Sequence, residues 1–320
     1  MEIEDKRKLI LNYLQKKVDT DCLKKIVTLR SYRIKDRLLK LLNCPQFYLP
    51  ALIINILNRI IPKFILRNKS LHTHIFNMKE IQLPLDDLSS LLLIHFGCPP
   101  SLPDIKLTKF LVKNLQSEDI FYDIGANIGY YSYLASIFCK EVHIFEPLPF
   151  IFEYIKENLA NDSNCFLNNL ALSDNEGYTN IYVGKYGTGA STIVNNVYDS
   201  CKAIFRKEPI KIKTITLDRY LENHHPPTII KLDVEGAESI VLKGAKNFLE
   251  SSESSLLIIM EVWSDKENLS YKAVEILENL GFKFVYKINL DGELEQVDKK
   301  IIYLKEYNDL NYVFTKTPRL

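Results

Sequence analysis

The chain has 320 residues, of which 47% are hydrophobic and 25% are charged, and its formal net charge is +1. This composition is ordinary for a soluble globular protein and allows one large domain or two modest ones. A net charge this close to zero gives no overall field that favours nucleic acid, so we expect no nucleic-acid partner.

The N-terminal part of the chain is basic. Residues 1–70 read as helices, and residues 1–46 carry twelve Lys or Arg against six Asp or Glu. A solvated helical face is the first explanation of this surplus, and an anionic partner or a membrane surface is the alternative. The first residues contain no long apolar stretch and no small-residue cleavage site, so we expect no signal peptide.

Residues 47–66, "FYLPALIINILNRIIPKFIL", predict an amphipathic helix. Their longest uncharged run covers 47–58, which is shorter than the roughly 20 residues that a membrane-spanning helix needs. Polar and apolar residues fall on opposite stripes of this helix. Its apolar stripe would pack on the main domain or on another subunit of a homo-oligomer, or it would make a peripheral contact with a membrane surface.

A domain boundary is predicted near residue 100. Residues 74–87 alternate enough to suggest a short hairpin or strand, and Pro99, Pro100 and Pro103 then interrupt the pattern. We therefore expect a helical, basic N-terminal extension over residues 1–100 and a second domain over residues 101–320.

Beyond the boundary, strands and helices alternate. The predicted strands cover residues 120–125, 141–147, 165–174, 179–183, 210–218, 228–233, 255–263, 283–288 and 311–316. The predicted helices cover residues 130–138, 150–161, 237–249 and 270–282. Continuous apolar strands separated by helices predict an α/β fold, a Rossmann-like, doubly wound and mostly parallel sheet with helices on both faces.

The six cysteines are scattered, with no C-x-x-C pair and no neighbouring group of histidines. This spacing argues against a zinc site, and a disulfide framework is not expected in a chain of this length. Reduced, mostly buried thiols are typical of an intracellular protein, so we expect a cytoplasmic location.

The segment "DIFYDIGANIGYYSYLAS", residues 119–136, predicts a strand, a sharp turn and a helix. Gly125 permits a turn that other side chains resist, and Gly129 lets the helix approach closely. Glu146 lies 21 residues past Gly125, at the tip of the next predicted strand, where a carboxylate commonly binds ribose hydroxyls. These residues together predict a nucleotide-like cofactor at the ends of the strands, whereas the glycines alone would also suit an ordinary tight turn.

The charge at this turn favours one cofactor over another. The dinucleotide pattern G-x-G-x-x-G lacks its middle glycine here, and Asp123 would repel a pyrophosphate. The sulfonium and ammonium groups of S-adenosylmethionine would instead attract this acid. Two alternatives stay open: a nicotinamide-dependent oxidoreductase on a similar sheet, and a non-catalytic binding module that has kept the fold.

Five stretches follow one another in an order that resembles the FkbM-type methyltransferase family. They are "FYDIGANIGYYS", "VHIFEPLP", "NLALSDNEG", "TITLDRYL" and "IIKLDVEGAESIVLKGA". The resemblance covers about residues 118–263 and does not extend to residues 1–100. It implies a Rossmann-like fold and methyl transfer from S-adenosylmethionine, mostly to hydroxyl oxygens of sugars and of polyketide or other secondary metabolites.

The resemblance also implies a cofactor site by position. The implied residues are Asp123, Gly125, Asn127, Gly129, Glu146, Pro147, Asn169, Leu170 and Ala171. Glu146 would hold the ribose, and residues 169–171 would lie near the adenine. Leu170 would fit the hydrophobic core equally well.

Acids at the ends of two other predicted strands are candidates for catalysis. Asp233 ends one strand, Glu235 follows it, and Glu261 ends the next. Acids at the ends of buried strands usually meet water, a metal or a substrate. We expect Asp233 or Glu235 to orient and deprotonate the acceptor hydroxyl, with Glu261 lining the same cleft. A divalent metal is the rival use of Asp233 and Glu261, but no D-x-D pair or nearby histidine completes a ligand set, so we predict no metal site.

Overall fold

A computed structural model describes two compact units, Met1–Lys113 and Asn114–Leu320. The described residues are 2–18, 70–76, 78–85, 87, 90–91, 93–94, 97–99, 101–185, 187–200, 202–262, 269–303 and 311–319. The amphipathic helix predicted over residues 47–66 lies outside them. Among the described helices, none combines the length and the apolarity that crossing a bilayer requires.

In the part of the first unit that the structure describes, the elements with given bounds are α1 (Ile3–Val18), β1 (Ser70–Ile75), β2 (Lys79–Pro84) and α7 (Leu102–Asn114). Strands β1 and β2 pair antiparallel as a hairpin, which begins and ends a few residues before the segment 74–87 in which the sequence suggested a hairpin or strand. The Arg7 guanidinium donates a hydrogen bond to the Val112 carbonyl and so ties α1 to α7.

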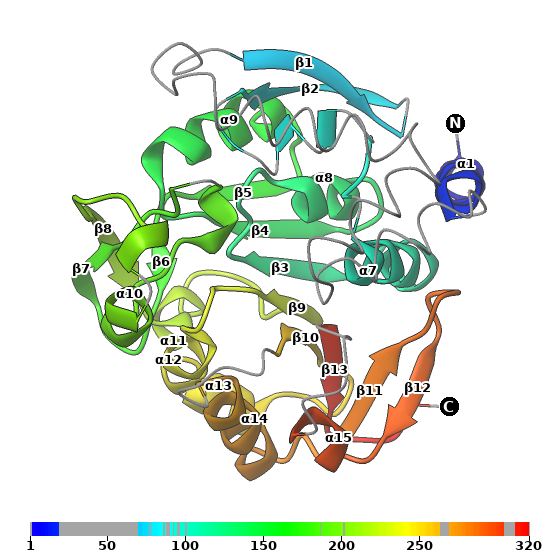
Figure 1. Ribbon diagram of the computed structural model, residues 1–320. Helices are drawn as coiled ribbons and strands as arrows, with labels where there is room; N and C mark the ends of the chain where they lie inside the picture. Colours follow the sequence, from blue (N-terminus) through cyan, green and yellow to red (C-terminus); the bar gives the residue numbers. More distant parts are fainter. Residues whose placement is uncertain are drawn as a thin grey trace, which may run out of the picture. The chain divides into compact units, whose positions relative to one another are not determined.

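The second unit is built on an eight-stranded sheet in the order β12-β11-β13-β10-β9-β3-β4-β5 (Figure 1). Its strands are β3 (Ile120–Ile124), β4 (Glu141–Phe145), β5 (Cys165–Asn168), β9 (Ile229–Leu232), β10 (Leu257–Glu261), β11 (Phe284–Ile288), β12 (Leu294–Val297) and β13 (Asn311–Thr315). Five consecutive strands, in the order β5, β4, β3, β9 and β10, pair parallel with one another. Strand β13 pairs antiparallel with β10. The predicted Rossmann-like, mostly parallel fold is confirmed.

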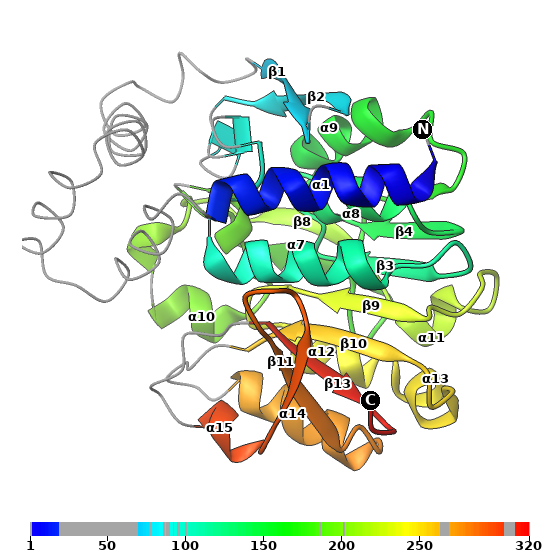
Figure 2. The ribbon, with the colours of Figure 1, turned by 90° about the vertical axis from the view of Figure 1, so that its right-hand side faces the viewer.

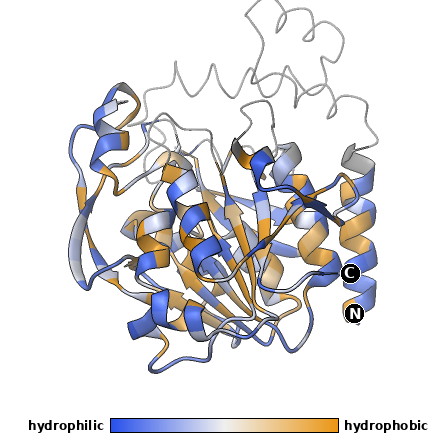
Figure 3. Cartoon of the chain, turned by 90° about the horizontal axis from the view of Figure 1, so that it is seen from below, coloured by the Kyte–Doolittle hydropathy of each residue, from blue (hydrophilic) through white to orange (hydrophobic). Residues whose placement is uncertain are grey.

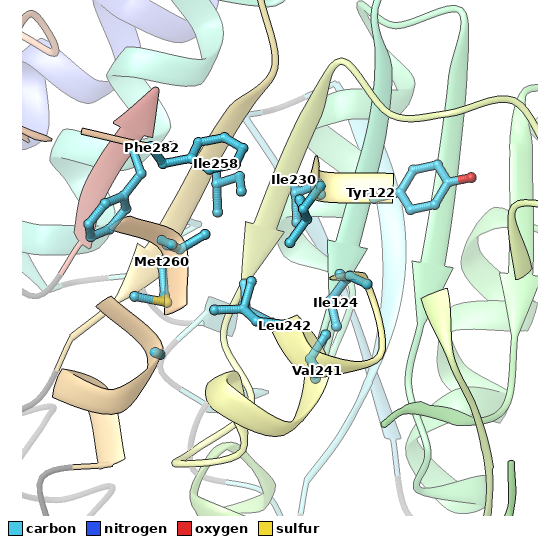
Figure 4. Packing of buried hydrophobic residues seen from close by; sticks show 14 of the residues in the cluster. Tyr122, Ile124, Ile230, Val241, Leu242, Ile258, Met260 and Phe282 are labelled. Atoms are coloured by element: carbon cyan, nitrogen blue, oxygen red, sulfur yellow. The ribbon is translucent and has the colours of Figure 1, made fainter. Parts of the chain in front are cut away.

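Helices of the second unit cover the sheet. They are α8 (Tyr130–Ser136), α9 (Pro149–Leu159), α11 (Leu217–Tyr220), α12 (Glu238–Lys243), α13 (Lys246–Ser251), α14 (Leu269–Asn279) and α15 (Lys300–Tyr303). Alternate strand residues such as Ile124, Ile230 and Met260 pack in one core cluster against Val241 and Leu242 of α12 (Figure 4). Apolar colouring is concentrated on the strands and on the helix faces turned toward them (Figure 3). This burial of apolar surface is the main stabilising contribution to the unit.

A small three-stranded sheet extends from the central one. It is formed by β6 (Ala171–Leu172), β8 (Ile210–Ile215) and β7 (Gly177–Ile181) in that order, and α10 (Asn195–Ser200) and the 3-10 turns η2 (Thr188–Ala190) and η3 (Lys202–Ile204) lie in the connection between β7 and β8. The single strand predicted over residues 165–174 is therefore wrong, because β5 and β6 belong to different sheets. Asn169 turns the chain between them by donating from its amide to the Glu146 carbonyl at 2.9 Å.

The helix predicted over residues 237–249 is also divided, into α12 and α13. A Cβ atom at Gly244, between the two helices, would lie 1.9 Å from the Ser173 carbonyl oxygen. The absence of a side chain therefore allows this junction to pack directly on backbone.

The order of connections places a topological switch point between β3 and β9. The chain proceeds from β3 to β4 and β5 on one side, and from β9 to β10 on the other, as Figures 1 and 2 both show. In open α/β sheets, ligands bind outside the carboxyl ends of the strands at such a point. The site is therefore expected where β3, β4 and β9 end.

Candidate functional site

The turn after β3 is held in a conformation that side chains resist. Gly125, Asn127 and Gly129 have positive φ angles of 82°, 50° and 80°. The Gly125 and Ala126 N–H groups both donate to the Phe145 carbonyl, at 3.1 and 3.0 Å, so the turn lies against the end of β4. A Cβ atom at Gly125 would lie 1.9 Å from the Asp233 carbonyl oxygen, and only glycine therefore fits.

Glu146 is fixed beside this turn. Its residue is only 5% exposed. One carboxylate oxygen accepts the Asn127 N–H at 2.9 Å, and the other accepts the Leu148 N–H at 2.8 Å. Hydrogen bonds of this kind, from backbone N–H groups to an ionised carboxylate, are about twice as strong as neutral ones. They set the orientation of the carboxylate, whose two oxygens together offer about four acceptor positions.

A cleft of about 590 Å³, including open solvent, lies at the ends of β3, β4 and β9. The predicted cofactor residues that line it are Gly125, Asn127, Glu146, Pro147, Leu170 and Ala171. Apolar side chains of Phe145, Ile181 and Ile193 complete one side, and Asp233 and Glu235 line it as well. An apolar cleft with a few converging polar groups is typical of a small-ligand site.

Three predicted cofactor residues do not line the cleft. Asp123 is fully buried and accepts a 2.6 Å hydrogen bond from the Ser132 hydroxyl of α8. Gly129 caps the N-terminus of α8. Asn169 binds the carbonyls of Glu146 and Pro147. These residues thus contact α8 and the backbone at the rim of the cleft, but they are not part of its lining.

The glycine-rich segment after β7 reaches the cofactor turn. The Thr188 hydroxyl donates to the Asn127 side-chain oxygen at 2.8 Å. Thr188, Gly189 and Ser191 line the cleft. The sequence "GKYGTGASTIV" of this segment, residues 184–194, fits a mobile loop that covers the cleft and selects the acceptor, or an ordinary hairpin excursion. The structure places part of the segment in the lining of the cleft, and its movement stays a prediction.

The three candidate catalytic acids come together. Carboxylate oxygens of Asp233, Glu235 and Glu261 all lie within 4.8 Å of one another. Adjacent parallel strands bring Glu261 of β10 to Asp233, which follows β9, and Glu235 has a positive φ of 51° that is unusual for its type. Sets of oxygen ligands also suit hard divalent cations, and exposed acids commonly gather in this way without an ion.

Lys231 of β9 is a charged group at this site that sequence reasoning missed. Its side chain is 4% exposed, and its ammonium lies 3.2 Å from Asp233 Oδ2 and 3.6 Å from Asp123 Oδ1. Burial lowers the pKa of Lys231, but the carboxylates of Asp233, Asp123 and Glu261 raise it further, so the net pKa lies above its ordinary value. The sequence signal that could have identified Lys231 is the presence of a lysine inside the apolar run "TIIKLD".

Glu238 holds the loop that carries two of the acids. Its Oε1 accepts the Val234 and Gly236 N–H groups at 3.2 and 3.3 Å. The residue is 2% exposed, and burial raises its pKa to about 7 against the opposing effect of these backbone donors. Glu238 lies in the first turn of α12, and its two hydrogen bonds shape the loop between Asp233 and Gly236.

Sequence comparison agrees with this geometry. The family model "Methyltransferase FkbM domain" matches residues 123–284, just over half of the chain. The hexuronic acid methyltransferase AglP of Haloferax volcanii is 30% identical over 151 residues, which are 45% of this chain and 56% of AglP. The chain thus spans just over half the length of that relative. Methyltransferase sdnD of Sordaria araneosa is 27% identical over 200 residues, which are 53% of this chain and 76% of sdnD.

Among solved structures, methyltransferase FkbM from Methylobacillus flagellatus KT is 13% identical, with a TM-score of 0.41. That alignment covers 71% of this chain and 54% of the other. The family assignment itself rests on the sequence match, which includes the glycine turn, Glu146 and the acids. The protein belongs to the FkbM methyltransferase family.

Proposed function

We propose that the protein transfers a methyl group from S-adenosylmethionine to a hydroxyl oxygen of a sugar, a glycan or a secondary metabolite. The observation that carries the proposal is the cleft at the switch point, with the oriented Glu146 carboxylate and apolar walls, and with Asp233 and Glu235 in its lining. Membership of the FkbM family supports methyl transfer. The name of AglP, a hexuronic acid methyltransferase, supports a sugar-like acceptor.

The residues present fit this cofactor. The backbone at Gly125 and the Glu146 carboxylate offer a polar cradle, and the lone pairs of Glu146 suit ribose hydroxyls. Leu170 and Ala171, with Phe145, offer an apolar wall for a flat base. When bound, S-adenosylmethionine supplies a methyl group activated by a positively charged sulfur.

The acids of the chain would act on the acceptor. Asp233 or Glu235 orients the acceptor hydroxyl and accepts its proton as that oxygen becomes the nucleophile, and a carboxylate oxygen of Glu261 lies within 4.8 Å of both acids. General-base catalysis of this kind contributes roughly 10²- to 10⁴-fold in rate. Precise positioning of the reactants can contribute roughly 7 to 11 kcal/mol of the barrier. The role of the fold is therefore mainly to align the acceptor with the cofactor cleft.

A screen with a tritiated methyl donor tests the proposal. Full-length protein would be incubated with S-adenosyl-[methyl-³H]methionine and sugars, lipid-linked glycans or polyketides. We expect label in an acceptor as a base-stable methyl ether. Label released by mild alkali would mark a carboxylate ester and contradict hydroxyl methylation. Absence of transfer to every acceptor, combined with failure to bind the donor, would contradict the function itself.

A further inference from the structure

A lysine lies in the middle of the parallel sheet, where charged residues are rare. Lys231 of β9 pairs in register with Asp123 of β3, and both side chains are buried. Asp123 Oδ2 is bound by the Ser132 hydroxyl, but Oδ1 accepts no hydrogen bond from the part of the chain that the structure describes. The Lys231 ammonium, 3.6 Å from that oxygen, is therefore the compensating charge for a carboxylate that water does not reach.

The same ammonium also reaches the acid cluster. Residues 231 and 233 are two apart on an extended chain, so their side chains project to the same face. Lys231 Nζ lies 3.2 Å from Asp233 Oδ2 and 5.1 Å from the centre of the Tyr131 ring of α8. Lys231 thus connects the strand that carries the cofactor turn to the acid at the acceptor end of the cleft.

Several carboxylates lie close to Asp233. Glu235 and Glu238 approach from the following loop and from α12, and Glu261 approaches from β10. Like charges at this distance repel one another, and a cation within hydrogen-bond distance of one carboxylate offsets that repulsion and fixes its position. Burial lowers the pKa of Lys231, but the carboxylates of Asp233, Asp123 and Glu261 raise it, so its ammonium stays charged and can act as that cation.

We propose that Lys231 is a positioning residue for methyl transfer: through its ion pair with Asp233 it holds that carboxylate directed into the cleft, while touching neither cofactor nor acceptor. The inference rests on the proposed function, because it assumes that the acceptor is deprotonated at the acid cluster. It concerns the acceptor end alone and therefore predicts little change in cofactor affinity.

The test compares variants that keep the buried charges balanced. Lys231→Met alone leaves the buried negative charge of Asp123 without a compensating cation, so this variant is expected to unfold more easily. The double variant Asp123→Asn/Lys231→Met avoids this problem, and it is compared with the single variant Asp123→Asn. Lys231→Arg, which keeps the charge, is the conservative variant. For each we would measure thermal unfolding, affinity for S-adenosylhomocysteine by calorimetry, and kcat and acceptor KM with the best acceptor of the screen.

The double variant should lose roughly tenfold or more in kcat relative to Asp123→Asn, while its acceptor KM changes by less than about threefold. Its affinity for S-adenosylhomocysteine should stay within about threefold, and Lys231→Arg should keep most of the wild-type kcat. An unchanged kcat in the double variant would overturn the proposal. So would a loss of cofactor affinity that matches the loss of kcat. Binding of the donor without transfer to any acceptor would instead contradict the proposed function.

Discussion

The carbonyl oxygen of Asp233 occupies the space beside Gly125 that a side chain would need. A Cβ atom built at Gly125 would lie 1.9 Å from that oxygen, and the φ angle there is 82°. The glycine turn after β3 and the loop that begins at Asp233 therefore touch through backbone. A side chain at Gly125 would have to displace that loop.

Gly125→Ala is predicted to damage both stability and cofactor binding. The positive φ alone costs roughly 1–3 kcal/mol for a residue with a side chain. Displacement of the Asp233 loop adds to this cost and should lower affinity for S-adenosylhomocysteine by at least about tenfold, or about 1.4 kcal/mol. Denaturant unfolding and titration calorimetry measure the two effects.

Gly281→Ala is the matched control for this change. Gly281 has a φ of 93°, but nothing lies within 4 Å of its Cβ position. It should lose stability through backbone strain and leave cofactor affinity unchanged. Equal affinities for the two alanine variants would contradict the steric argument.

Glu146→Gln should weaken cofactor binding without unfolding the protein. The amide can accept only one of the two backbone N–H groups that the carboxylate accepts, so the side chain loses its orientation as well as its charge. We expect roughly 10- to 100-fold weaker binding of S-adenosylhomocysteine, since hydrogen bonds to charged groups contribute about 1.5–3 kcal/mol. Glu153→Gln, on the exposed face of α9, serves as the control and should bind normally. A Glu146→Gln variant of wild-type affinity would remove Glu146 from the site.

Asp233→Asn and Glu235→Gln separate the two candidate bases. The variant that removes the base should lose roughly 10²- to 10⁴-fold in kcat. Affinity for S-adenosylhomocysteine should change little, because the acids act on the acceptor. Glu222→Gln, an exposed acid after α11, is the control for a neutralised surface charge. Wild-type turnover in both acid variants would refute general-base catalysis by this cluster.

Thr188→Val tests the contact between the glycine-rich segment and the cofactor turn. The variant keeps the shape of the side chain but removes the hydroxyl that donates to Asn127 at 2.8 Å. One neutral hydrogen bond contributes about 0.5–1.5 kcal/mol, so affinity for S-adenosylhomocysteine should fall by roughly 2- to 12-fold. Limited proteolysis should cut residues 184–194 faster in the variant, and cofactor should protect the wild type more strongly. The four samples are wild type and Thr188→Val, each with and without cofactor. Identical cleavage in all four would contradict the idea that the segment closes over the cleft.

His143 should make stability depend on pH. It is fully buried, with Nδ1 2.9 Å from the Tyr220 hydroxyl, Nε2 3.3 Å from Glu141, and its ring stacked between Tyr122 and Phe166. Burial lowers the pKa of His143 to about 4, which outweighs the opposing effect of Glu141, and His224 and His225 lower it further. The folded state therefore resists a proton that the unfolded state accepts below about pH 6.5.

The contribution of His143 to the free energy of unfolding is complete above about pH 6.5. It decreases by up to about 3 kcal/mol as the pH falls toward 4. Glu238, whose pKa is raised to about 7, changes stability in the opposite sense within this range. Comparing wild type with His143→Gln at each pH removes the contribution of Glu238. The stability difference between them should shrink as the pH falls from 7 to 4, and a constant difference would contradict the assignment.

The sequence predicted the parts of the fold that depend on local pattern. The apolar runs predicted over 228–233 and 255–263 contain β9 (Ile229–Leu232) and β10 (Leu257–Glu261), and the turn at Gly125 leads into a helix, because burial and glycine conformations leave few alternatives. Long-range contacts were not predictable. The break between β5 and β6 depends on an amide reaching the Glu146 carbonyl, and the break at Gly244 depends on the Ser173 carbonyl.

In the candidate site, too, features set by local pattern and topology were predictable and long-range contacts were not. The positions of Glu146 and Asp233 at strand ends follow from topology, and the structure places both in the lining of the cleft. Asp123 stays a predicted cofactor residue; in the structure its carboxylate accepts a hydrogen bond from Ser132 and lies 3.6 Å from the Lys231 ammonium. Sequence distance conceals such a pairing, because only the register of β3 and β9 brings Asp123 and Lys231 together. The assigned roles in binding and catalysis stay predictions.

Titration calorimetry of the full-length protein tests the central claim most directly. S-Adenosylmethionine and S-adenosylhomocysteine should each bind at one site per chain, with affinity that falls in Glu146→Gln, while NADH gives no heat of binding. Binding of NADH in place of both sulfur compounds, or an affinity for them that is indifferent to Glu146, would contradict a cofactor site in this cleft.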